Sequence, residues 1–196
     1  MRILLLGGFL GSGKTSVLLP LAKYLTKSGS KVAIIENEIG DISIDGYTMK
    51  NEGMQVKELF AGCICCTFGL ELVKGIKELA EAESPDWIII EATGVAYPSA
   101  ITGNIAGKID TDLLRTVILA DAERLPLILE MLGEIIPLQL EQADLLLLNK
   151  TDLVSSEEAD KAEELIRKIN ASAPIYRICA KDGLTEDILA IIAGKN

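Results

Sequence analysis

The sequence contains no histidine and few aromatic residues, and no apolar run approaches the roughly 20 residues of a membrane span. Phe, Trp and Tyr make up 4% of its 196 residues, whereas apolar residues make up 49%. The core must therefore consist mostly of Leu, Ile, Val and Ala, as in parallel sheets that helices cover on both faces. Without imidazole, a metal site can use only thiolates, carboxylates, backbone groups or water.

Positive charge is also scarce. The formal net charge is −10, with 19 Lys and Arg against 29 Asp and Glu, which argues against binding to nucleic acid or to an anionic membrane. The first residues read as a strand that leads directly into a glycine-rich loop, so we expect no cleavable leader. We expect a cytoplasmic protein with a single domain over residues 1–196.

Apolar runs alternate with helical patterns along the chain, which predicts an α/β fold of three layers. Its mainly parallel central sheet would have helices on both faces. We expect strands at Arg2–Leu6, Lys31–Ile35, Val56–Leu59, Trp87–Ile90, Thr116–Ala120, Leu145–Leu148 and Ile175–Ile178. We expect helices at Lys14–Ser28, Phe68–Glu83, Glu123–Ile136, Glu157–Asn170 and Thr185–Ala193, with Ser155 or Ser156 capping the fourth and a loop over 39–52.

Residues 8–15 read Gly-Phe-Leu-Gly-Ser-Gly-Lys-Thr, which fits the phosphate-loop pattern G-x-x-x-x-G-K-[ST] between a strand and a helix. Such glycines let backbone N–H groups face phosphates at a helix N-terminus. Lys14 would reach the β and γ phosphates and serve catalysis, and the Thr15 hydroxyl would ligate Mg²⁺. A glycine-rich turn with a chance Lys-Thr pair is the alternative. The prediction is a P-loop NTPase fold in which the nucleotide contacts Gly11, Ser12, Gly13, Lys14, Thr15 and Ser16.

The tetrad N-K-x-D of residues 149–152 follows a buried strand, at the sheet edge where ligands bind in open parallel sheets. Asp152 can accept hydrogen bonds from N1–H and the 2-amino group of guanine, a pair of donors that adenine lacks. Asn149 and the Lys150 stem would support the base. Residues 179–181, Cys-Ala-Lys, are similar to the loop whose backbone N–H reads guanine O6 in GTPases, which adds Ala180 and Lys181. A polar turn is the alternative, and GTP or GDP is the favoured ligand.

Acidic residues follow two further strands. Glu91 ends one of them, where its carboxylate can orient the Mg²⁺ shell or the attacking water while the Gly94 N–H faces the γ-phosphate. Glu36 and Glu38 open the irregular stretch after another strand, as expected of a loop that senses the nucleotide. Solvated loop carboxylates are the alternative interpretation.

Three of the four cysteines, Cys63, Cys65 and Cys66, lie within four positions beside a glycine. In a reducing compartment this pattern favours a metal or redox site over a disulfide framework. Thiolates suit Zn²⁺ or Cu(I), and three ligands leave one coordination position open, as in a site that passes its metal on. Three buried apolar side chains and a redox pair remain as alternatives.

The segments GFLGSGKT, ENEIGDISIDG, GCICC, EATGVAYP and NKTD follow in this order over residues 1 to about 181. Together they resemble the CobW-type GTPases of the SIMIBI class, relatives of the urease and hydrogenase nickel-insertion GTPases. The resemblance implies slow hydrolysis of GTP to GDP and phosphate, with Mg²⁺ as cofactor and a Walker-B-like role for Glu91. It also implies that Cys63, Cys65 and Cys66 bind Zn²⁺, Co²⁺ or a similar ion for a client metalloprotein. Glu36, Glu38 and Asp41 would be switch residues able to add a metal ligand.

The chain departs from that family pattern because it stops at Asn196, without the further domain and His-rich stretch of most members. We therefore expect a compact form, with no nucleic-acid or membrane partner and, by resemblance, a GTP-dependent homodimer. Two other functions stay open. One is a GTP-dependent assembly or reactivation factor for a cobalamin, corrinoid or other metalloenzyme, with a structural metal at the cysteines. The other is a P-loop module that binds GTP without hydrolysing it.

Overall fold

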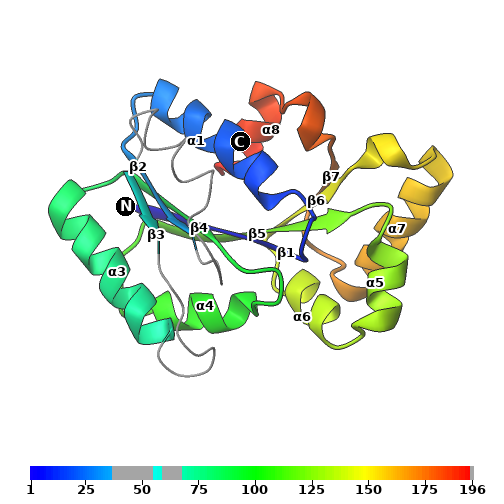
Figure 1. Cartoon of the computed structure of the whole chain (residues 1–196), viewed down its shortest axis with the longest axis horizontal. Coiled ribbons are helices and arrows are strands. Elements are labelled where there is room, and N and C mark those ends of the chain that lie inside the picture. Colours follow the sequence, from blue (N-terminus) through cyan, green and yellow to red (C-terminus); the bar gives the residue numbers. More distant parts are fainter. Residues whose placement is uncertain (37–54, 59–67, 195–196) are drawn as a thin grey trace.

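The computed structural model describes residues 1–36, 55–58 and 68–194. Within them, seven strands form one parallel sheet with the order β3-β2-β4-β1-β5-β6-β7 (Figure 1). The P-loop strand β1 is central, between β4 and β5. The strands are β1 Arg2–Gly8, β2 Val32–Glu36, β3 Gln55–Glu58, β4 Trp87–Glu91, β5 Leu113–Asp121, β6 Leu145–Asn149 and β7 Ile175–Arg177.

Helices cover both faces of the sheet. Helices α1 and α8 lie on one face, and α3 to α7 lie on the other (Figure 1). The predicted three-layer α/β fold is therefore confirmed. The helices are α1 Lys14–Lys27, α3 Phe68–Glu83, α4 Pro98–Ile105, α5 Leu125–Met131, α6 Ile135–Glu141, α7 Ser156–Ile169 and α8 Glu186–Ile192, with short 3-10 turns η1 Thr151–Leu153 and η2 Ala180–Asp182.

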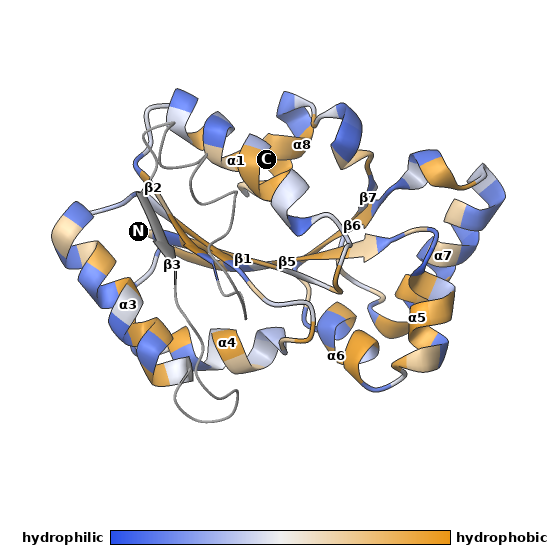
Figure 2. Ribbon diagram, viewed as in Figure 1, coloured by the Kyte–Doolittle hydropathy of each residue, from blue (hydrophilic) through white to orange (hydrophobic). Residues whose placement is uncertain are grey.

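Strand β1 shows why the sheet needs two covering layers. Successive side chains of a strand point to opposite faces, so Leu4 and Leu6 pack toward α1 and α8 while Ile3 and Leu5 pack toward α3 and α4. All four side chains are fully buried. Figure 2 shows the same division, since the apolar faces of the helices turn toward an apolar sheet. Burial on both sides explains the unbroken apolar runs in the sequence.

One expected helix, Glu123–Ile136, is wrong: two helices, α5 and α6, occupy this region. Pro137 explains the break, because in a continuous helix its ring would clash with the carbonyl of Gly133 four residues earlier. Pro137 instead lies in the first turn of α6, where its missing N–H costs nothing. Helix α4 was not predicted from the sequence.

The remaining expected helices and strands are present, with ends that differ by a few residues. The expected loop over 39–52 lies outside the described residues. Ser155 is the N-cap of α7, and its side chain and that of Glu158 form a capping box. Among the described residues, no helix combines the length and the apolar character that crossing a membrane would require.

Candidate functional site

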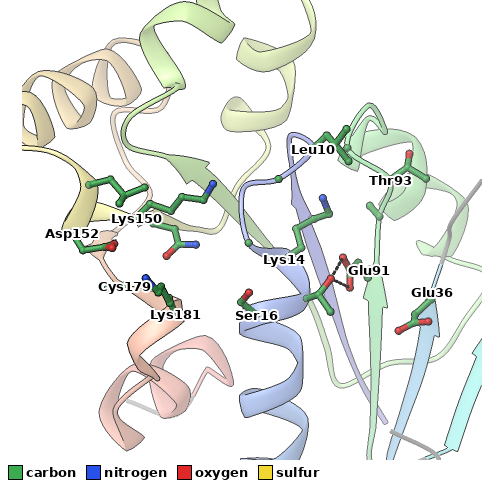
Figure 3. Close-up of a pocket in the computed structure, with 17 residues that line it drawn as sticks. Leu10, Lys14, Ser16, Glu36, Glu91, Thr93, Lys150, Asp152, Cys179 and Lys181 are labelled. Atoms are coloured by element: carbon green, nitrogen blue, oxygen red, sulfur yellow. Dashed lines mark hydrogen bonds between the residues drawn. The ribbon is translucent and has the colours of Figure 1, made fainter. Parts of the chain in front are cut away.

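A cavity of about 710 Å³ opens at the carboxyl ends of the central strands. It brings together segments that are far apart in the sequence (Figure 3). Figure 3 shows Glu91 and Glu36 on one side and Lys150 and Asp152 on the other, with Lys14 between them. The lining residues are Leu10, Gly11, Gly13, Lys14, Thr15, Ser16, Glu36, Glu91, Ala92, Thr93, Gly94, Asn149, Lys150, Asp152, Leu153, Cys179 and Lys181.

The phosphate loop takes the shape expected for anion binding at the start of α1. Gly13 is the left-handed N-cap of this helix, with φ 99°, and a Cβ there would lie 2.3 Å from Asn149 Nδ2. Only glycine adopts this positive φ readily and also leaves room for the Asn149 side chain. Lys14 is buried, and its Nζ donates a hydrogen bond to the Gly8 carbonyl at 3.1 Å, so the ammonium group already lies against the loop.

Oxygen ligands for a hard cation lie next to the loop. The Thr15 hydroxyl donates to the Glu91 carboxylate, at 3.1 Å from Oε1 and 3.4 Å from Oε2. Glu36 ends the neighbouring strand level with Glu91, is buried and also lines the cavity. A hydroxyl and a carboxylate beside a phosphate loop match the oxygen donors that Mg²⁺ prefers, so these residues fit the ion.

Gly94 lies against the tip of the phosphate loop. A Cβ on Gly94 would be 2.6 Å from the backbone nitrogen of Leu10, so a larger residue would displace one of the two segments. Gln139 of α6 holds the Gly94 segment from behind: its Nε2 donates to the carbonyls of Gly94 and Ala96 at 3.1 and 2.9 Å. Because Gln139 is buried, the contact fixes the Gly94 backbone beside the cavity.

The N-K-x-D segment, residues 149–152, is connected to the phosphate loop through Asn149. Its side chain is buried, donates to the Ser12 carbonyl at 2.8 Å and accepts from the Ala180 N–H at 2.9 Å. Asn149 thereby ties residues 8–15 to the loop after β7. Asp152 lies beyond Asn149 at the cavity wall, where its carboxylate can meet a ligand.

Cys179 lies beside Asp152 in the cavity wall, although sequence reasoning gave its thiol no role. A hydrogen bond to the Asp152 carboxylate, with a second to Asp182, raises the pKa of the Cys179 thiol. The sulfur lies 3.1 Å from Asp182 Oδ2. The thiol is therefore a neutral hydrogen-bond donor at neutral pH.

Several predicted site residues are not tested by this geometry. Glu38, Asp41, Cys63, Cys65 and Cys66 lie outside the described residues. Within the described ranges, no three Cys, Asp or Glu residues come together as a metal site. Ser12 and Ala180 are buried behind the cavity wall rather than in it.

Other residues of the site were not predicted. Leu10 and Thr93 line the cavity at positions of the GFLGSGKT and EATGVAYP segments that were given no role, and Leu153 follows the N-K-x-D tetrad. Asp121 forms a salt bridge of 2.7 Å with Lys150, and its signal was available: it is a carboxylate at the carboxyl end of a buried strand.

The cavity thus joins a phosphate loop, a hydroxyl–carboxylate pair and an N-K-x-D segment at the carboxyl edge of a parallel sheet. These features define the class of P-loop nucleotide-binding domains. Residues 2–177 match the family described as CobW/HypB/UreG, nucleotide-binding domain, and the chain belongs to this family. The resemblance noted in the sequence is therefore confirmed.

Similar proteins include "Zinc chaperone YjiA" of Escherichia coli K12, which is 35% identical over 193 residues, covering 93% of this chain and 58% of that protein. "Zinc-regulated GTPase metalloprotein activator 1" of Schizosaccharomyces pombe is 34% identical over 202 residues, covering 97% of this chain and 48% of that protein. The chain spans about half the length of the curated relatives that it matches.

The fold is shared with solved structures of lower sequence identity. The crystal structure of HypB from Helicobacter pylori in complex with nickel matches with a TM-score of 0.71 and 19% identity, covering 100% of this chain and 86% of that one. HypB from Archaeoglobus fulgidus matches with a TM-score of 0.69 and 18% identity.

Proposed function

We propose that this domain binds GTP and GDP with Mg²⁺ and hydrolyses GTP slowly to GDP and phosphate. The observation that carries the proposal is the cavity itself. It places Glu91, to which the Thr15 hydroxyl donates, at one end, Lys150 and Asp152 at the other, and Lys14 between them. Each end recognises one part of a guanine nucleotide, and the cavity between them is continuous.

The phosphate end would act through local charge. In a chain with a net charge of −10, the buried Lys14 ammonium and the N–H groups at the start of α1 supply the positive potential that attracts phosphates. Mg²⁺ held by Thr15 and Glu91 would neutralise charge on the phosphate oxygens. Gly94, fixed by Gln139, would present its N–H toward the terminal phosphate.

The base end can be tested with Asp152→Asn. This substitution replaces an acceptor of the guanine N1–H and 2-amino hydrogens by an amide, whose own N–H can donate to the 2-oxo group of xanthine. We expect the affinity for GDP to fall about 100-fold while the affinity for xanthosine diphosphate rises, because an unpaired polar contact costs about 2–3 kcal/mol. Fluorescence titration with both nucleotides measures the change.

Asp187→Asn is the matched control, since it removes a carboxylate of α8 that does not line the cavity. It should leave both affinities unchanged. If the Asp152→Asn variant still preferred GDP over xanthosine diphosphate as strongly as the unchanged protein, guanine recognition by Asp152 would be contradicted.

We further propose that the nucleotide controls transfer of a transition metal, zinc in the first instance, to a client metalloprotein. Two relatives carry names that describe a zinc chaperone and a zinc-regulated metalloprotein activator, which favours zinc over cobalt. The position of β3 in the sheet also supports coupling between the nucleotide and the metal. Glu58 of β3 lies level with Glu36 of β2, which lines the nucleotide cavity. The chain continues from Glu58 toward Cys63, Cys65 and Cys66. The strand that precedes the cysteines and the strand that lines the cavity therefore end at the same edge of the sheet.

A GTP-dependent homodimer is the oligomeric state that we propose. Its support is a group of exposed apolar side chains in the segments beside the cavity: Leu10 is 72% exposed, Val95 50% and Tyr97 42%. Burial of such side chains favours association. Light scattering with GDP and with a non-hydrolysable GTP analogue should show a larger mass only with the analogue, and a monomer in both states would contradict the proposal.

A further inference from the structure

Asp121 is a buried carboxylate at the end of β5 that none of the nucleotide-binding motifs includes. Its side chain is 3% exposed. In the sheet it lies level with Asn149, the last residue of β6 and the first of the N-K-x-D segment. A buried charge is unfavourable unless it is paired and hydrogen-bonded, so its partners indicate what the carboxylate holds in place.

The two oxygens of Asp121 have separate partners. Oδ2 forms the 2.7 Å salt bridge with Lys150 Nζ. Oδ1 accepts hydrogen bonds from the N–H groups of Glu123 and Arg124, at 3.1 and 3.2 Å. One oxygen therefore stabilises the turn after β5, while the other pairs with Lys150 of the N-K-x-D segment.

Lys150 has a backbone conformation that needs support. Its φ of 63° and ψ of 34° are left-handed, which is unfavourable for a residue with a side chain. It stands between Asn149, which contacts the phosphate loop and Ala180, and Asp152 in the cavity wall. The conformation of Lys150 consequently sets the placement of Asp152 relative to the phosphate loop.

We propose that Asp121 is a positioning residue for guanine recognition. By holding the Lys150 ammonium at the end of β5, it fixes the left-handed turn that presents the Lys150 stem and the Asp152 carboxylate to the base. The inference rests on the proposed binding of guanine nucleotides. It adds to the N-K-x-D segment a residue from a different strand.

The test is Asp121→Asn, with affinities measured for GDP and for inosine diphosphate, which lacks the 2-amino group. Asparagine keeps an acceptor for the turn and removes the charge that pairs with Lys150. We expect the affinity for GDP to fall about 10-fold, as for neighbouring residues of one ion-pair network. The preference for GDP over inosine diphosphate should also shrink, because Asp152 reads the 2-amino group. A merely structural role would lower stability without changing this preference.

Asp144→Asn is the matched control. Asp144 precedes β6 at the opposite sheet edge, and its carboxylate accepts a hydrogen bond from the Thr116 N–H at 2.7 Å. Both nucleotide affinities should stay as in the unchanged protein. If they fell as in Asp121→Asn, the effect would be a general loosening of the sheet and the inference would be overturned.

Lys150→Met completes a double-mutant cycle, since methionine keeps an apolar stem without the charge. The double variant should lose no more affinity than the more affected single variant. It also removes both charges together, so it carries the test if Asp121→Asn does not fold. The inference would be overturned if the variants kept the affinity and the preference of the unchanged protein. It would also be overturned if the fold-loss of the double variant equalled the product of the two single fold-losses. Failure of the unchanged protein to bind GDP would contradict the proposed function instead.

Discussion

At the scale of single residues, the site depends on backbone segments that approach each other closely. Gly94 packs on the backbone of Leu10, and Gly13 packs on the side chain of Asn149. Each glycine joins two segments that come from different strands. The absence of a side chain there is a packing requirement of the folded cavity.

Gly94→Ala should therefore weaken nucleotide binding. The added Cβ would meet the Leu10 nitrogen at 2.6 Å and its Cα at 2.9 Å, so the tip of the phosphate loop must shift. We expect a loss of about 10- to 100-fold in affinity for GTP, since misplacing a binding group by about 1 Å has effects of this size. Equilibrium titration with a fluorescent GTP analogue measures the loss.

Gly103→Ala is the control for this substitution, because Gly103 lies exposed within α4 with no atom near its would-be Cβ. It should raise the free energy of unfolding by about 0.5–1 kcal/mol through the better helix propensity of alanine. Nucleotide affinity should not change. Equal affinities for the two alanine variants would show that the contact between Gly94 and Leu10 is unimportant.

The sequence predicted those site residues that belong to a local pattern. Lys14, Thr15, Asn149 and Asp152 stand at fixed spacings after strands, and the geometry of a parallel sheet brings strand ends together. Asp121 also stands at a strand end, but its pairing with Lys150 could not be predicted, because the two residues are distant in the sequence and meet only through the register of β5 and β6.

At the scale of elements, helix α7 shows how a local signal determines a boundary. The Ser155 side chain accepts from the Glu158 N–H, and the Glu158 carboxylate accepts from the Ser155 N–H at 2.8 Å. This reciprocal pair satisfies two N–H groups at the start of the helix. The carboxylate is held ionised, since the Ser155 hydrogen bonds lower the pKa of Glu158 below its usual 4.5.

This capping box predicts a dependence of stability on pH. A carboxyl whose pKa is lowered by folding stabilises the protein above its unfolded pKa, and this contribution is lost as pH falls through the folded pKa. Glu158→Gln should therefore lower the urea midpoint at pH 7, and its effect should shrink as pH falls from 4.5, the usual pKa, through the lower pKa of the folded state. Circular dichroism of urea unfolding at pH 7 and pH 2.5 measures both midpoints.

Glu157→Gln is the matched control, because it removes a charge from the same helical turn without touching the cap. Glu157 is exposed and pairs with Lys161, so its loss should have a smaller effect at pH 7. Were the two variants equally unstable at pH 7, helix charge rather than the cap would explain the result.

The elements also show where sequence patterns are insufficient. The apolar period of Glu123–Ile136 fits one helix, yet Pro137 beyond its end prevents continuation past Gly133. The apolar pattern correctly indicated buried helical residues, which α5 and α6 both contain. An apolar pattern carries no information about the steric effect of a proline on the preceding helical turn.

At the scale of the whole molecule, the sheet order explains how distant motifs form one site. Strand β1 carries the phosphate loop, with β4 and Glu91 on one side and β5 and Asp121 on the other. Beyond β4, β2 ends at Glu36 and is followed by β3, which leads toward the cysteine segment. The nucleotide cavity and the end of β3 thus share one edge of the sheet.

This shared edge predicts coupling between the nucleotide and zinc, with Cys65→Ser abolishing zinc binding and Cys179→Ser leaving it intact. Cys179 is the matched control because its thiol faces Asp152 and Asp182 instead. The most direct measurement is a competition titration of Zn²⁺ against a chelating dye, once with GDP and once with a non-hydrolysable GTP analogue. The two zinc affinities should differ about 5- to 150-fold, the usual range for coupled sites. Equal zinc affinities in the two nucleotide states would contradict a nucleotide-controlled zinc switch.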